Sequence, residues 1–211
     1  MLRRIYYLLA FILLFGLTCY LLTSPRLARL FHPLPYRAEI GAAAAAQGLD
    51  PFFIAAVIRT ESSFRETAVS SEGARGLMQL LPSTAEWIAA QNGENDFHPD
   101  RLFEPRYNII AGTRYLADLL RQFEGNEVAA LAAYNGGRGR VQRWLEEGLW
   151  DGSEAALARI PFGETRAFVK RVLKNYRSYR ELYDEDLFVT GAAEPLQRAA
   201  FARGQLPPKI Q

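Results

Sequence analysis

A helical spacing of apolar residues runs through most of this chain and limits the folds open to it. After Pro51, for example, Ile54, Val57 and Ile58 recur at steps of three and four residues, the period of a helix with one buried face. No stretch of the sequence alternates apolar and polar residues over the length of a strand. The sequence therefore predicts an all-α fold with helices over these segments: Tyr36–Gln47, a segment from Pro51, 82–91, Arg106–Phe123, Glu127–Tyr134, a segment around Val141–Leu145 that ends at Gly148, and Glu164–Tyr183.

Residues at the ends of these segments support the boundaries. Asp50 followed by Pro51 is typical of an N-cap and a first helical position. Gly48 follows the alanine-rich helix as a C-terminal stop, and the 82–91 helix has a candidate cap near Ser83. Hydrophobic residues make up 49% of the chain and aromatic residues 12%, so the composition supports a hydrophobic core and excludes long-range disorder.

The first 24 residues carry a separate signal. Ile5–Leu22 is an 18-residue run without a charge, which at about 1.5 Å per residue gives roughly 27 Å of helix. A cleaved signal peptide needs a small-residue cleavage site, and Thr-Ser-Pro at 23–25 is a poor one. A lipoprotein needs small residues before its cysteine, and the residues before Cys19 fit badly. We therefore expect a single, uncleaved N-terminal transmembrane helix.

Charge leaves the orientation of this helix open, because Arg3 and Arg4 precede it and three arginines follow it before residue 38. Three prolines stiffen the segment that follows the helix. The expected organisation is a membrane anchor at 1–24, a linker at 25–35, a helical domain at 36–189 and a loose tail at 190–211.

Charge and the rarity of metal-binding residue types exclude several functions. The chain has 25 Lys+Arg and 23 Asp+Glu, and Arg3 and Arg4 account for the excess because residues 1–24 hold no acid. Nucleic-acid binding, which needs a clustered basic face, is therefore not expected. Cys19 is the only cysteine and there are two histidines, too few for a Cys/His zinc site. The acidic loop at 92–100 lacks EF-hand spacing, so neither a metal nor a cofactor is expected.

Glu61 stands out because it extends an apolar stripe. It lies seven residues after Ile54, on the face that carries Val57 and Ile58. A carboxyl on the core side of a helix is costly unless it is neutral or paired, and burial raises its pKa, as a general acid requires. The alternative is a helix-end glutamate that leans into solvent or pairs with an arginine. Placement alone leaves both interpretations open.

Four short motifs surround this glutamate in sequence. With the lead-in Gly48-Leu49-Asp50-Pro51, they form an ordered set that resembles the catalytic domain of soluble-type (SLT) lytic transglycosylases, relatives of goose-type lysozyme. The resemblance covers about residues 36–183. The motifs are Glu61-Ser62-Ser63-Phe64, the GLMQLLPSTA segment at 76–85, the AAYNGG segment at 132–137 and the IPFGETR segment at 160–166.

This resemblance implies a lysozyme-like helical domain and a reaction on peptidoglycan. The family cleaves the β-1,4 bond between N-acetylmuramic acid and N-acetylglucosamine without water and leaves a 1,6-anhydro end. Glu61 matches its single acid/base, which protonates the glycosidic oxygen and then deprotonates the C6 hydroxyl that attacks the anomeric carbon. A second carboxylate, which most glycosidases need, is absent from the family's mechanism, and the acetamido group of the substrate is thought to assist.

The resemblance also implies a set of residues that contact the glycan. Two departures stand out: the family often has a second methionine where Leu81 stands, and Gly137 occupies a variable position. Four residues of the set have a structural alternative: Ser70 as a loop hydroxyl, Met78 as a core residue, Asn135 as part of a helix stop and Glu164 as a residue that favours the helix dipole. The implied substrate-binding residues are Ser70, Met78, Gln79, Tyr134, Asn135 and Glu164.

Peptidoglycan strands and, through the N-terminal helix, the membrane are the expected partners of a monomer. Because the wall lies outside the cytoplasmic membrane, the resemblance implies a single-pass protein with its N-terminus inside and its catalytic domain outside. Two alternatives stay open. One is a hydrolase of the same fold in which Glu61 activates water, and the other is a membrane-tethered, non-catalytic glycan-binding domain.

Overall fold

A computed structural model describes residues 2–188, and the predicted tail at 190–211 lies outside these residues. The chain divides into two compact units, Met1–Leu34 and Pro35–Gln211. Within residues 2–188 the regular structure is helical, with only isolated β-bridges at Val69–Arg75 and Arg75–Leu80. The predicted all-α fold is therefore confirmed for this part of the chain.

The first unit contains two helices, α1 (Leu2–Thr23) and α2 (Pro25–Phe31). Among the residues from 2 to 188, no helix has both the length and the apolarity that a bilayer crossing requires. The predicted transmembrane helix is therefore wrong. The prediction rested on an uncharged run of 18 residues, which is at the short end of the roughly 17–25 residues that cross a bilayer. The length of the run was therefore weak support for a membrane span. In α2, Pro25 begins a short helix inside the expected linker, because proline is accepted at the first helical position.

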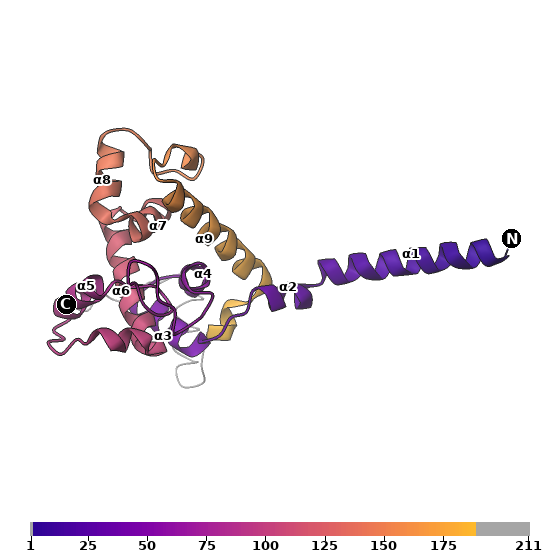
Figure 1. Ribbon diagram of the computed structural model, residues 1–211, viewed down its shortest axis with the longest axis horizontal. Helices are drawn as coiled ribbons and strands as arrows, with labels where there is room; N and C mark the ends of the chain where they lie inside the picture. The colour runs from indigo at the N-terminus through magenta and orange to yellow at the C-terminus, as the bar shows by residue number, and fades with distance from the viewer. Residues whose placement is uncertain (1, 189–211) are drawn as a thin grey trace. The chain divides into compact units, whose positions relative to one another are not determined.

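The second unit holds the remaining helices (Figure 1). In chain order they are α3 (Arg37–Gln47), α4 (Pro51–Glu61), α5 (Pro82–Gln91), the 3₁₀ helix η1 (Pro99–Phe103), α6 (Pro105–Gln122), α7 (Glu127–Gly136), α8 (Arg138–Glu146), η2 (Leu157–Arg159), α9 (Gly163–Leu182) and η3 (Glu185–Phe188). Every longer helix of the sequence prediction is present. The predicted cap at Ser83 is wrong by two residues, because Pro82 already takes the first helical position and Leu81 is the N-cap.

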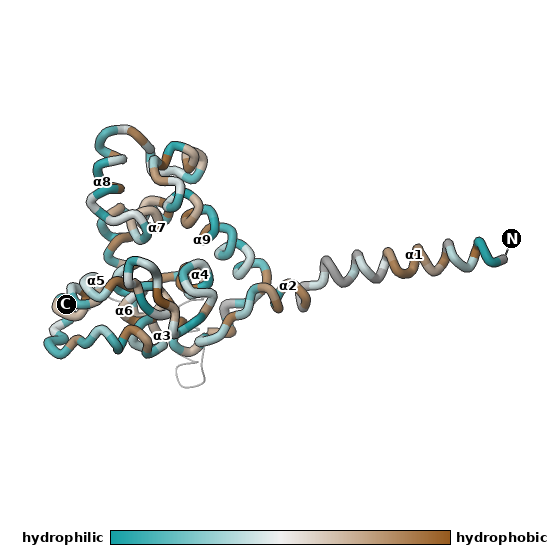
Figure 2. The backbone as a smooth tube through the Cα atoms, viewed as in Figure 1, coloured by the Kyte–Doolittle hydropathy of each residue, from teal (hydrophilic) through white to brown (hydrophobic). Residues whose placement is uncertain are grey.

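The core is built around α4, which is buried on all sides. Its residues from Pro51 to Ile58 are all buried, as expected for a helix that is apolar around its whole circumference. It packs along α9 and also contacts α3, and α7 packs against both α6 and α9. Figure 2 shows hydrophilic and hydrophobic residues alternating along α9, and its buried residues, which include Phe168 and Val172, form one face. Glu61 is thus the last residue of the most buried helix in this unit.

Asp50 fixes the start of α4 and ties it to α9. Its Oδ1 accepts a hydrogen bond from the amide of Phe52 at 2.7 Å, which confirms the predicted N-cap. Its Oδ2 accepts from the hydroxyl of Tyr176 and from the guanidinium of Arg180, both at 2.7 Å. One carboxylate therefore sets both the first turn of α4 and its alignment with α9.

We expect Asp50→Ala to lower the free energy of unfolding by about 2–3 kcal/mol, because it removes a helix cap and leaves the half-buried Tyr176 hydroxyl without its acceptor. Urea unfolding followed by circular dichroism measures the loss. Asp50→Asn keeps an oxygen at the cap but not the acceptor of Tyr176 and Arg180, so it should lose less than Asp50→Ala does. Equal losses in the two variants would contradict a capping role.

Candidate active site

Glu61 is a half-buried carboxyl at the C-terminal end of α4. Burial raises its pKa from 4.5 to about 8; the positive charge of Arg171 opposes this rise, and the negative charge of Glu164 adds to it. Both of these residues belong to α9, seven positions apart and therefore on one face of that helix. At neutral pH the Glu61 carboxyl keeps its proton, which is the state of a general acid.

The chain turns sharply straight after Glu61. Ser62 is buried, and its hydroxyl donates a hydrogen bond to the carbonyl of Leu77 at 2.8 Å, which fastens the end of α4 to the segment at 76–80. Ser63 and Phe64 have left-handed backbone conformations, with φ of 53° and 63°. This turn leads the backbone away from the helix axis and leaves Glu61 at the end of the helix.

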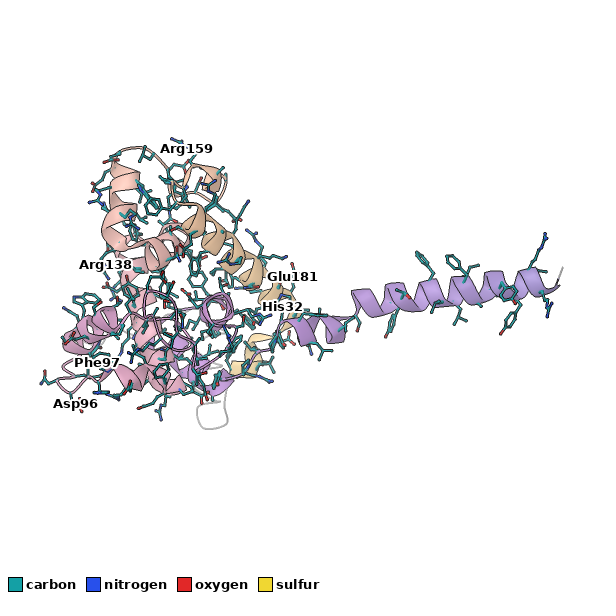
Figure 3. The ribbon with its side chains drawn as sticks, viewed as in Figure 1. His32, Asp96, Phe97, Arg138, Arg159 and Glu181 are labelled. Atoms are coloured by element: carbon teal, nitrogen blue, oxygen red, sulfur yellow. The ribbon has the colours of Figure 1, made fainter. Side chains whose placement is uncertain are left out.

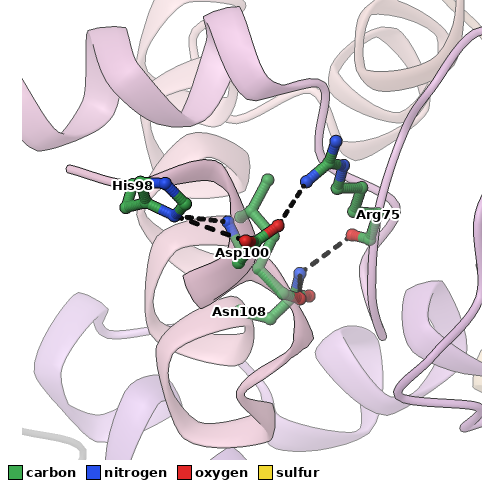
Figure 4. Close-up of polar contacts among 5 residues, drawn as sticks. Arg75, His98, Asp100 and Asn108 are labelled. Atoms are coloured by element: carbon green, nitrogen blue, oxygen red, sulfur yellow. Dashed lines mark hydrogen bonds and ion pairs between the residues drawn. The ribbon is translucent and has the colours of Figure 1, made fainter.

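The segment from Arg75 to Leu80 is clamped against α6 by one buried amide, that of Asn108. The side chain of Asn108 accepts from the amide of Met78 at 2.7 Å and donates to the carbonyls of Arg75 at 2.9 Å and Leu102 at 2.8 Å. Figure 4 shows the hydrogen bond from Asn108 to the carbonyl of Arg75. Beside it lie the ion pair of Arg75 with Asp100, 3.0 Å long, and the neighbouring His98. The segment is therefore held by the Asn108 side chain in addition to its isolated β-bridges.

Gly76 is required at this clamp for two reasons. Its φ of 76° lies in the left-handed region, and a Cβ on it would collide with the carbonyl of Leu102 and the amide of Asn108. The first glycine of the GLMQ motif is thus explained by packing.

Met78 is completely buried, so its side chain belongs to the core and presents no surface to a sugar ring. Its thioether packs against Gly112 of α6 so closely that a Cβ at position 112 would collide with it. The sequence left two roles open for the Met78 side chain, contact with a sugar ring and packing in the core, and the structure shows the second. The backbone of Met78 has a second use, described below.

Gln79 has a left-handed backbone with φ of 48°, and its side chain is partly buried. Both N–H groups of the side-chain amide are engaged inside the segment, since Nε2 donates to the carbonyl of Ala68 at 3.0 Å and to that of Gly76 at 2.9 Å. The amide oxygen is the atom that this arrangement leaves for a ligand. The sequence interpretation expected donor and acceptor alike to face the glycan.

Tyr134, in the last turn of α7, lies next to Glu61. Its hydroxyl donates to the backbone carbonyl of Met78 at 2.7 Å, and its ring contacts those of Tyr115 and Phe168 at centroid distances of 5.3 and 6.4 Å. Burial raises the pKa of Tyr134 well above its usual value, and the charge of Glu61 adds to this. The structure therefore brings together Glu61, Tyr134 and the GLMQ segment, which lie far apart in sequence.

Asn135 and Glu164 are joined to this group through α9. The side-chain oxygen of Asn135 accepts from the hydroxyl of the buried Thr165 at 2.8 Å, so the end of α7 is fastened to the start of α9. Glu164, the residue before Thr165, is exposed and close enough to raise the pKa of Glu61. Gly137, with φ of 91°, ends α7 where the sequence predicted a stop.

Ser70 lies in a tight turn of its own. Its hydroxyl oxygen accepts from the amides of Glu72 and Ala74, both at 3.2 Å, and its amide donates to the carbonyl of Ala74. Among the contacts of residues 2–188, none joins Ser70 to Glu61. Hydrogen bonds from Ser71 and also from the Ser70 hydroxyl lower the pKa of the neighbouring Glu72 carboxyl, and the role of Ser70 toward a ligand stays a prediction.

Sequence reasoning missed Arg171, Thr165 and Asn108, which set the charge around the site and position its parts. None belongs to the motifs in a way that marks a role: Arg171 lies among other basic residues of α9, and Asn108 sits in an apolar stripe where an amide looks out of place. The position of Asn108 in this stripe was the signal that could have revealed its role, because a buried polar side chain must have hydrogen-bond partners. Within the described part of the chain, no group of three His, Cys, Asp or Glu side chains is placed to hold a metal ion.

The two charges on α9 give a test of how the pKa of Glu61 is set. We expect Arg171→Gln to raise this pKa above about 8, because it removes the opposing positive charge, and Glu164→Gln to lower it. If protonated Glu61 is the active form, the alkaline limb of the pH–activity profile moves up in the first variant and down in the second. Lys174→Gln, an exposed change on the same helix, serves as the control. Shifts in the same direction for both variants would contradict this arrangement.

An all-helical domain with one half-buried, protonated carboxyl beside a tyrosine and two amides is of the lysozyme-like class. The family described as the transglycosylase SLT domain matches residues 39–155. The soluble lytic murein transglycosylase of Salmonella typhimurium is 42% identical over 128 residues, which are 59% of this chain and 20% of that protein. The chain belongs to the SLT-domain transglycosylase family, and the resemblance seen in its motifs is confirmed.

Two solved structures have the same fold. The 70-kDa soluble lytic transglycosylase of Escherichia coli superposes with a TM-score of 0.71 at 32% identity, over 80% of this chain and 28% of that one. An inactive Glu-to-Gln mutant of the lytic transglycosylase Slt of Pseudomonas aeruginosa gives 0.66 at 36% identity, over 73% and 25%. The chain thus spans about a quarter of the length of these relatives.

Proposed function

We propose that this chain is a peptidoglycan lytic transglycosylase that cleaves the β-1,4 bond between N-acetylmuramic acid and N-acetylglucosamine and leaves 1,6-anhydro ends. The observation that carries the proposal is the half-buried carboxyl of Glu61 at the end of a buried helix and next to Tyr134, where burial raises its pKa to about 8. Membership of the SLT family and the names of the relatives support the same activity.

In the proposed reaction Glu61 acts twice. Its proton passes to the glycosidic oxygen as the bond from that oxygen to the anomeric carbon breaks, and Glu61 becomes a carboxylate. The carboxylate then takes the proton of the C6 hydroxyl while that oxygen bonds to the anomeric carbon of the same sugar. The carboxyl is restored and no water is consumed. A group that gives and takes a proton in one cycle works best with a pKa near the ambient pH, as burial provides here.

Tyr134 is proposed to stabilise the positive charge that develops at the anomeric carbon. Its hydroxyl hydrogen is committed to the carbonyl of Met78, so the lone pairs of the oxygen are the part that can face a cation. Burial keeps this hydroxyl protonated. The contact with Met78 gives that residue an indirect role, in which its backbone and not its side chain serves the site.

The remaining predicted residues are proposed to contact the glycan from the edges of the site. The amide oxygen of Gln79 accepts a hydrogen bond from the substrate, because its N–H groups are engaged. Asn135 is oriented by Thr165 and offers its N–H groups. Glu164 and Ser70 lie further out, and their contact with substrate is the least constrained part of the proposal.

Hydrolysis is the second candidate reaction, and Glu164 is the observation that favours it. In this alternative Glu61 activates water, and hydrolases of the lysozyme-like class usually have a further carboxylate in the cleft; Glu164 is an exposed carboxylate near Glu61. Against it, the relatives named above are lytic transglycosylases. A non-catalytic glycan-binding role is disfavoured by the protonated Glu61, which binding alone does not require.

Products separate these candidates. The full chain is incubated with purified peptidoglycan, and the released muropeptides are analysed by mass spectrometry before and after borohydride reduction. Anhydro ends that resist reduction support the transglycosylase, reducible ends support hydrolysis, and binding without release supports the non-catalytic role. Because peptidoglycan lies outside the cytoplasm, we propose that the protein acts there, as a monomer, since one chain supplies all the proposed site residues.

A further inference from the structure

Trp87 is an exposed tryptophan held in a fixed position. Its side chain is 40% exposed, whereas Trp144 and Trp150 are 6% and 1% exposed. Arg138 is the first residue of α8 (Figure 3), and its guanidinium lies 4.7 Å from the centre of the Trp87 ring. Arg138 is itself fixed by an ion pair with Asp118, 2.6 Å long. The indole is thus clamped on one face while it remains open to solvent.

An open groove with a volume of about 200 Å³ begins at this indole. Ile88 adds apolar surface, and the amides of Gln47, Gln91 and Asn92 supply hydrogen-bonding groups around it. Sites for drug-sized ligands are larger, about 300–1,000 Å³. The groove therefore has room for one small ring and not for an extended chain.

Each charged residue that lines the groove forms an ion pair within the protein. Asp118 pairs with Arg138 and also with Arg121, at 3.3 Å, and Arg114 pairs with Glu94 at 3.1 Å. Because two arginines share the single carboxylate of Asp118, the charge around the groove is positive, which disfavours a cationic ligand. A flat aromatic surface ringed by amides suits a ligand that has an apolar face and several hydroxyl or amide groups.

We infer that this groove is a second saccharide-binding site, which holds one N-acetylated sugar of a glycan strand against Trp87. The choice of an N-acetylated sugar rests on the proposed function. The groove shares no residue with the group around Glu61. Tyr115 connects the two, because its ring contacts that of Tyr134 at 5.3 Å and lies 5.5 Å from the guanidinium of Arg138.

The test uses the full chain with Glu61→Gln, to prevent turnover, and a hexamer of β-1,4-linked N-acetylglucosamine. Trp87 is the exposed tryptophan of the three, so acrylamide quenching of the fluorescence reports on it. We expect the hexamer to shift the emission to shorter wavelengths and to protect it from quenching. Trp87→Ala, added to this background, should weaken hexamer binding in calorimetry about tenfold.

Two further variants separate a sugar platform from a general effect of removing an aromatic ring. Trp87→Phe keeps a platform and should bind within about twofold of the parent. Tyr7→Ala removes another exposed ring, one that lies on α1 and does not line the groove, and should bind as the parent does. Absence of hexamer binding, binding that leaves Trp87 unprotected, or equal affinity in Trp87→Ala overturns the inference.

The outcome is independent of the test for activity. Protection of Trp87 without anhydro products would overturn the proposed reaction and leave the saccharide site standing. Anhydro products without protection of Trp87 would support the proposed reaction and overturn the saccharide site.

Discussion

Replacement of Glu61 by glutamine should reduce muropeptide release by at least about a hundredfold, since one residue is asked to serve as both acid and base. The amide keeps the volume and polarity of the carboxyl but has no proton to give. In the relative from Pseudomonas aeruginosa a Glu-to-Gln mutant is inactive, as a single essential carboxyl would predict. Release is measured by mass spectrometry, with Glu86→Gln, an exposed change on α5, as the control. Near-normal release from Glu61→Gln would refute the mechanism.

The same variant should be more stable than the parent at high pH. The pKa of Glu61 is near 4.5 in the unfolded chain and about 8 in the folded one, so between these values the unfolded chain releases a proton that the folded chain retains. Stability therefore falls as pH rises through this window, by on the order of a few kcal/mol for this half-buried group. Glu61→Gln lacks this loss, so the two proteins should unfold alike at pH 4 and diverge toward pH 8. Equal melting curves at both pH values would exclude the raised pKa.

Removal of the Asn108 side chain should have the largest effect on stability. Asn108→Ala strips partners from the buried amide of Met78 and from the carbonyls of Arg75 and Leu102, and each unsatisfied buried group costs about 1–3 kcal/mol. We expect a loss of about 3 kcal/mol or more in the free energy of unfolding, measured with urea. The activity per folded molecule should also fall. The reason is that the variant releases the segment that carries Gln79 and the Met78 carbonyl, which accepts the hydrogen bond of the Tyr134 hydroxyl.

Asn95→Ala is the matched control for this experiment. It removes the same side chain from an exposed loop position and should change stability by less than about 0.5 kcal/mol. If Asn108→Ala were as stable as this control, the clamp would not be what holds the segment.

The helices were predictable because each carries its own signal. Asp50 and Pro51 mark the start of α4, and Gly137 marks the end of α7. The apolar stripe of α9 identifies that helix from its own sequence, without information on the helices that pack against it. The short helix α2 was missed because prolines were taken as a mark of a linker, although Pro25 occupies a position that a helix accepts. The transmembrane prediction failed because it rested on the length of one run at the limit of the usual range.

Residues of the site could be predicted from the sequence only where they belong to one of the motifs. Glu61 and Tyr134 come from separate motifs, and nothing in the spacing reveals that the tyrosine hydroxyl is fastened to the carbonyl of Met78. Met78 and Gln79 show the limit most clearly: the motif marks both, yet the fold buries the first side chain and engages both N–H groups of the second. Which atoms of a motif remain for a ligand depends on contacts between distant segments.

The turn after Glu61 has a consequence for evolution. Ser63 and Phe64 both hold a left-handed backbone that suits glycine, and such residues cost roughly 1–2 kcal/mol each. Selection for heat resistance alone would favour glycine at the exposed Ser63, whereas at Phe64 the loss of a partly buried ring opposes that gain. Glycine would also let the turn open and would loosen the carboxyl that precedes it. Stability and turnover are therefore opposed at this point of the chain, and a heat-adapted relative would have to gain its stability elsewhere.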